Sequence, residues 1–186
     1  MPRALIVHAS RHGATAGIAE RIGEVLRSRS IDAVVAPAAR APDPFGFDAC
    51  VVGAGVYMGS WVKDGTDYLE RYQATLAAVP TWLFSSGPLP GSTKQAAGTD
   101  ALGLALGPSE GPGSGGRRKV QALADVIGAR DHRVFEGAFD PAAPPRTMSE
   151  RMIRLLPAGK GLLPAGDFRP WDRIDEWAAG IAAAIG

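Results

Sequence analysis

Apolar residues gather along the chain in short runs, and between these runs they recur at helical spacing. The runs predict five strands, at Arg3–Ala9, Asp32–Ala36, Ala49–Gly53, Thr81–Ser86 and Arg133–Phe139. Alternation of buried strands with helices is typical of a parallel sheet covered on both faces. We therefore predict an α/β fold, a doubly wound five-stranded parallel sheet with strand order 2-1-3-4-5, as a single domain over residues 1–186.

The segments between the strands predict the helices. Helical spacing begins after Gly13, recurs over 62–76 and 120–127, and runs from near Pro170 to the C-terminus. Ser60 is the expected cap of the second helix, and Thr147 with Glu150 forms a capping box before a further helix. The glycine-rich segment 107–116 has few groups to bury, which predicts a mobile loop.

Composition and charge narrow the classes of partner. The net charge is +1 and no basic run occurs, so we predict no nucleic-acid partner. Cys50 is the only cysteine, which excludes an internal disulfide, and its apolar neighbours predict that it is buried. No apolar run approaches the roughly 20 residues of a transmembrane span, which leaves only peripheral membrane contact. A strand begins within four residues of Met1, with no leader pattern, so we expect a cytoplasmic location.

The first predicted strand runs into a polar loop with one glycine. This loop consists of Ser10, Arg11, His12, Gly13, Ala14 and Thr15. A strand, a short loop and a helix N-terminus with free backbone N–H groups form a phosphate-binding arrangement. The loop lacks the Gly-Lys-Ser/Thr of nucleoside-triphosphate loops and the three glycines of dinucleotide loops. Ser10 and Thr15 would then donate to a phosphate monoester; the alternative is an ordinary turn in which Thr15 only caps the helix.

Two further loops follow the third and fourth predicted strands, at Gly53–Ser60 and Ser85–Pro90. In a doubly wound sheet, ligands bind at the carboxyl ends of the strands where the winding reverses. An aromatic side chain, Tyr57, and exposed glycine amides there suit the ring of flavin mononucleotide (FMN). Tyr57 and Trp61 can instead be core aromatics, an interpretation we favour for Trp61. The predicted cofactor contacts are Ala54, Gly55, Val56, Tyr57, Met58, Gly59, Ser85, Ser86 and Gly87.

The sequence gives little support for a metal site or for a nucleophilic serine. The three histidines do not cluster with carboxylates at metal-ligand spacing, so we predict no metal site. The serines at positions 10, 85 and 86 lack the nucleophile-elbow sequence of a hydrolase. Since a flavin carries its own reactivity, we assign no catalytic side chain.

These segments resemble the flavodoxin-like domain family. Ser10–Thr15 and Val51–Gly59 are similar to the phosphate loop and second loop of the branch that contains menaquinone-dependent protoporphyrinogen dehydrogenase. The similarity continues through Glu136–Ala138, Met152–Leu156 and the final tryptophan-containing helix. The resemblance implies a flavodoxin-like fold, FMN as cofactor, and two-electron oxidation of a porphyrinogen coupled to a quinone. Segment 88–116, where this branch carries a basic, aromatic insertion, is rich in glycine and alanine, which leaves the substrate open.

Three classes of function follow. The first is an FMN-dependent oxidoreductase with a small-molecule substrate and a redox partner or quinone, whose acceptor arrives near helix 147–156. The second is a small FMN electron carrier without a substrate; such carriers often present an acidic face, so the near-neutral charge favours the enzyme. The third is a scaffold that binds partners and no flavin.

Overall fold

The computed structural model describes residues 1–57, 59–87, 114–139 and 166–186. Its parallel sheet consists of β1 (Arg3–Ala9), β2 (Asp32–Pro37), β3 (Ala49–Tyr57), β5 (Thr81–Ser86) and β6 (Asp131–Phe135) in the order β2-β1-β3-β5-β6. Counted over the predicted strands alone, this is the expected order 2-1-3-4-5, so the fold prediction is confirmed. The short β4 (Ser60–Trp61) pairs antiparallel with β3, and β7 (Ala138–Phe139) pairs with β8 (Gly166–Asp167).

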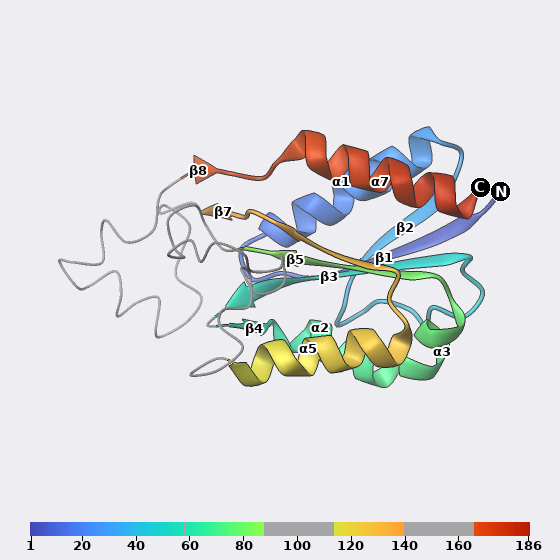
Figure 1. Cartoon of the computed structure of the whole chain (residues 1–186). Coiled ribbons are helices and arrows are strands. Elements are labelled where there is room, and N and C mark those ends of the chain that lie inside the picture. The colour runs from blue at the N-terminus through green and yellow to red at the C-terminus, as the bar shows by residue number, and fades with distance from the viewer. Residues whose placement is uncertain (58, 88–113, 140–165) are drawn as a thin grey trace.

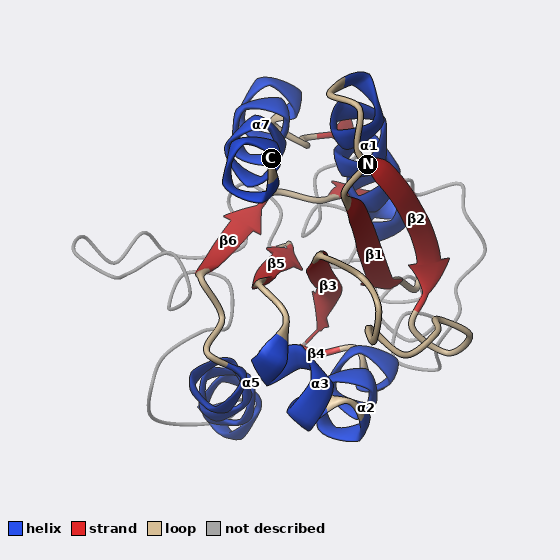
Figure 2. Cartoon of the chain, turned by 90° about the vertical axis from the view of Figure 1, so that its right-hand side faces the viewer, coloured by secondary structure: helices blue, strands red, loops and turns tan. Residues whose placement is uncertain are grey.

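Helices cover both faces of the sheet (Figure 2). One face carries α1 (Ala14–Ser28) and α7 (Trp171–Ile185), and the other carries α2 (Lys63–Arg71), α3 (Gln73–Ala78) and α5 (Ser114–Ile127). Figure 1 shows β4, β7 and β8 at the end of the sheet opposite the two termini, where β3 also ends. No helix among the described residues is long and apolar enough to cross a membrane.

The strand sequences explain the two cores. In β1, Leu5 and Val7 join the core under α2, α3 and α5, whereas Ala4 and Ile6 join the core under α1 and α7. A strand whose two faces are both covered needs apolar residues at successive positions, as this run has. Cys50 is fully buried in β3, as predicted, and burial raises the pKa of its thiol.

Several predicted boundaries are wrong. The third strand continues to Tyr57 instead of ending at Gly53, and residues 60–61 return as β4, which makes Ser60 a strand residue and not a helix cap. The last predicted strand begins two residues earlier and ends at Phe135, and Ala138–Phe139 pair with β8 instead. A strand ends where its pairing with a neighbouring strand ends, and the local sequence does not show where that is.

The helix predictions also need correction. The segment 62–76 is broken at Tyr72 into α2 and α3. Residues 114–116, expected in a loop, begin α5 instead. A Cβ on Gly116 would overlap Ser60 and the Gly59 carbonyl, so the close packing there needs a glycine. The rest of the glycine-rich segment and the helix expected after Thr147 lie outside the described residues.

Candidate functional site

The loop between β1 and α1 forms the N-terminus of α1. Gly13 is the cap residue, with φ of +88°, a backbone conformation that glycine adopts without steric cost. The Ser10 Oγ accepts a hydrogen bond of 2.9 Å from the Gly13 N–H. No acidic residue lies in the first turn of α1, and no side chain caps it. The first N–H groups of this helix are therefore available to an anion.

Thr15 lies inside α1, two residues after the cap residue Gly13, so it does not cap the helix. Its side chain is 2% exposed, and its hydroxyl makes no side-chain hydrogen bond within the described residues. A Cβ built on Gly55 of β3 would lie 3.2 Å from Thr15 Oγ1. The first and second predicted loops thus meet at a hydroxyl that still has donor and acceptor capacity.

Tyr57 at the end of β3 lies beside the first loop and outside both cores. The Arg11 guanidinium carbon lies 4.7 Å from the centroid of the Tyr57 ring, a cation–π distance, and the His12 ring centroid lies at 6.2 Å. The Tyr57 ring also covers Gly55, where a Cβ would lie 3.1 Å from its Cε2. Trp61, by contrast, is 5% exposed in the core, as we favoured.

The third predicted loop meets the second through its backbone. Gly87 has φ of +103°, its N–H donates to the Phe135 carbonyl at 2.9 Å, and a Cβ on it would lie 3.8 Å from the Val56 carbonyl oxygen. Ser86 is 5% exposed and its Oγ faces Gly137. The structure therefore brings the three predicted loops together, with Ala14 in the first loop and Gly59 in the second. Of the other predicted contacts, Ala54 is fully buried and Met58 lies outside the described residues.

Ser85 does not present its side chain to these loops. It is fully buried, and its Oγ accepts a hydrogen bond of 2.8 Å from Trp61 Nε1 and lies 2.9 Å from His132 Nε2. The indole N–H can only donate, and the Ser85 hydroxyl has a donor and a second lone pair left for His132, so this contact fits either neutral tautomer of the ring. The Ser85 hydroxyl therefore links β4, β5 and β6 through Trp61 and His132. Local sequence spacing gave no signal of this network, because the sheet register creates it.

Burial lowers the pKa of His132 to about 4, from an ordinary value of 6.5, although Asp131 acts in the opposite direction. The unfolded chain then binds a proton between these two pH values that the folded chain does not, so stability falls as the pH falls from 6.5 to 4. We expect a loss of roughly 3 kcal/mol in unfolding free energy over that window. Urea unfolding of the wild type and of His132→Gln, which keeps an acceptor for Ser85 but does not titrate, checks this. His8 titrates in both proteins, so parallel pH profiles would contradict the assignment to His132.

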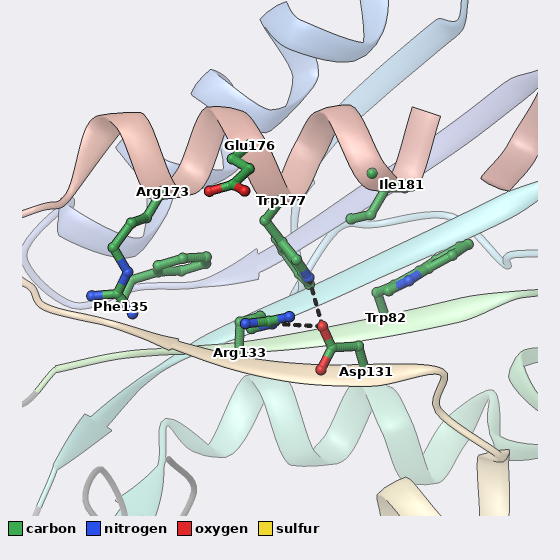
Figure 3. A pocket seen from close by; sticks show the side chains of 9 residues that line it. Trp82, Asp131, Arg133, Phe135, Arg173, Glu176, Trp177 and Ile181 are labelled. Atoms are coloured by element: carbon green, nitrogen blue, oxygen red, sulfur yellow. Dashed lines mark hydrogen bonds and ion pairs between the residues drawn. The ribbon is translucent and has the colours of Figure 1, made fainter. Parts of the chain in front are cut away.

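A cavity of about 370 Å³ lies elsewhere, between α7 and the sheet edge at β6 (Figure 3). Trp82, Phe135, Trp177 and Ile181 provide its apolar lining. The polar atoms there are largely paired with one another, since Asp131 accepts from Trp177 Nε1 at 2.9 Å and from the Arg133 Nε at 2.7 Å. We therefore place the candidate site at the three loops and not in this cavity.

Comparisons with known proteins agree with the fold. The family model described as Flavodoxin domain matches residues 5–140. A flavodoxin from the domain Archaea is 12% identical, with 98% of each chain covered and a TM-score of 0.58. A short-chain flavodoxin associated with a non-canonical PDU bacterial microcompartment is 15% identical, with 100% of each chain covered and a TM-score of 0.58.

An enzyme also shares the fold. The rubredoxin oxygen:oxidoreductase of Desulfovibrio gigas is 11% identical, with a TM-score of 0.57; the match covers 98% of this chain but only 36% of that enzyme. The comparison with curated proteins gives no match. At these identities the structural matches show a common fold.

Proposed function

Because the chain belongs to the flavodoxin domain family, we propose that it binds FMN at its three converging loops and acts as an FMN-dependent oxidoreductase. Members of this fold family bind FMN, whose isoalloxazine ring supplies the electron-transfer chemistry when it is bound. The observation that carries the proposal is that Thr15 and Tyr57 both lie close to Gly55. The N-terminus of α1, which suits a phosphate, therefore lies next to an aromatic ring that suits a flavin.

The residues present fit such a cofactor. The Thr15 side chain is buried with its Oγ1 beside Gly55, the first turn of α1 has no acid, and a Cβ on Gly13 would meet nothing within 4 Å. These features suit a dianionic phosphate, with Ser10 and the loop amides as further donors. Arg11 and His12 add positive charge or hydrogen-bond donors at the same loop.

The ring would lie against Tyr57. Replacing Tyr57 by alanine should weaken FMN binding by about 1–2 kcal/mol, or roughly five- to thirtyfold. It should also raise the reduction potential, because stacking favours the electron-poor oxidised ring over the reduced anion. Flavin fluorescence titration and spectroelectrochemistry check both.

Tyr72→Ala is the matched control, since Tyr72 also carries an arginine over its ring, with the Arg71 guanidinium carbon 6.0 Å from the centroid. It lies between α2 and α3, away from the loops. If Tyr57→Ala leaves both affinity and potential at the wild-type values, the ring does not stack there.

The finer function that we propose is a quinone-coupled oxidation of a porphyrinogen, which the sequence resemblance to the dehydrogenase branch implies. The second candidate is an electron carrier, which the full-length structural matches to flavodoxins favour. A protein reconstituted with FMN, supplied with protoporphyrinogen and a menaquinone analogue, separates them. Flavin-dependent formation of porphyrin supports the oxidoreductase, whereas no porphyrin together with rapid one-electron exchange with a flavodoxin reductase supports the carrier. The cytoplasmic location and the single domain stay predictions from the sequence.

A further inference from the structure

Arg169 lies between β8 and α7, beyond the residues that the family model matches. Its guanidinium is held firmly. Asp167 accepts hydrogen bonds of 2.7 Å from both Nε and Nη2, and the Trp171 ring centroid lies 4.3 Å from the guanidinium carbon. The side chain is 19% exposed. A side chain ordered in this way loses little conformational entropy when it binds a ligand.

The remaining nitrogen of this guanidinium, Nη1, faces α1. It lies so close to Gly17 that a Cβ at that position would overlap it. Gly17 belongs to the first turn of α1, since its N–H donates to the Gly13 carbonyl at 2.9 Å. Within the described residues, Nη1 has no hydrogen-bond partner. The Nη1 of Arg169 therefore lies beside the first turn of α1, which follows the proposed phosphate loop.

This placement brings a guanidinium close to the positive end of a helix dipole. The N-terminus of a helix carries a partial positive charge, so a cation beside it is repelled. The first turn of α1 contains no acid that offsets the repulsion, and Arg11 lies in the same loop. The Asp167 carboxylate binds the opposite edge of the guanidinium. A bound anion at this N-terminus would be attracted both by the guanidinium and by the helix.

We propose that Arg169 donates a charge-assisted hydrogen bond to the phosphate of FMN at the N-terminus of α1, and that it makes the site selective for a phosphorylated flavin. The proposal rests on the proposed function. In this arrangement the phosphate is bound by Arg169, from the C-terminal part of the chain, as well as by the loop Ser10–Thr15.

The test compares FMN with riboflavin, which has the same ring but no phosphate. Apoprotein of the wild type, Arg169→Gln and Arg173→Gln is titrated with each flavin at several salt concentrations. Arg173 is the matched control, because it lies on α7 and pairs with Glu136 at 3.5 Å. For Arg169→Gln we expect a roughly tenfold higher Kd for FMN, an unchanged Kd for riboflavin, and a weaker salt dependence of FMN binding.

A second variant, Gly17→Ala, keeps the test valid if Arg169→Gln does not fold. Gly17→Ala displaces Nη1 but favours the helix, since alanine has the higher helix propensity, so it should lower FMN affinity selectively while urea unfolding shows no loss of stability. An equal loss of FMN and riboflavin affinity in Arg169→Gln, or no loss of either, overturns the role of Arg169. A wild-type protein that binds neither flavin overturns the proposed function instead.

Discussion

Replacing Thr15 by alanine should weaken FMN binding by roughly ten- to a hundredfold, because it removes a hydrogen bond to a charged phosphate worth about 1.5–3 kcal/mol. Thr15 lies in the first turn of α1, and its buried side chain brings Oγ1 beside Gly55 of β3. Thr15→Ser keeps the hydroxyl and should restore most of the affinity. Fluorescence titration with FMN measures both variants.

Thr66→Ala is the control for this substitution. Thr66 is also a buried helix threonine, 7% exposed, but its Oγ1 donates to the Lys63 carbonyl within α2 at 2.9 Å. Its loss should leave FMN affinity at the wild-type value. If Thr15→Ala and Thr66→Ala bind FMN equally well, the hydroxyl of Thr15 does not contact the phosphate.

The second large effect concerns stability at Gly53. Gly53 pairs with Phe84 across β3 and β5, and a Cβ at Gly53 would overlap the end of the Phe84 ring. Gly53→Ala should therefore cost roughly 1–3 kcal/mol in unfolding free energy through overpacking. Phe84→Ala alone should cost roughly 3–5 kcal/mol, because Phe84 is fully buried against Phe135 and Trp177.

A double-mutant cycle isolates the contact. In the Phe84→Ala background, Gly53→Ala fills vacated space and should become neutral or stabilising. Gly180→Ala is the control, since a Cβ there meets nothing within 4 Å in α7, and it should stabilise the protein by roughly 0.5–1 kcal/mol. Additive effects of Gly53→Ala and Phe84→Ala in urea unfolding would show that the ring does not require the glycine.

Gly53 also shows what the sequence could and could not predict. The strands, their order and the convergence of three loops follow from apolar runs, since burial on both faces leaves a strong local pattern. The predicted strand ends at Gly53 and leaves Gly55 in a loop, because glycine usually marks a turn. In the structure they continue β3, and their reason lies across the sheet in Phe84 and, for Gly55, in Tyr57 and Thr15.

The remaining differences have the same cause. Ser85 was predicted as a cofactor contact from its place at a strand end, but its hydroxyl binds Trp61 and His132, which are far from it in sequence. Arg169 had no sequence signal, because its position beside Gly17 depends on how β8 and α7 return to α1. Local patterns predict elements and edges; they do not predict which side chains meet between distant segments.

The most direct test of the central claim is calorimetric titration of the apoprotein with FMN and with riboflavin at the same salt concentration. We predict that FMN binds at least tenfold more tightly, because the site supplies helix N–H groups, the Thr15 hydroxyl and cationic side chains to a phosphate. Equal affinities for the two flavins, or binding of neither, would contradict the proposal that these loops form an FMN site.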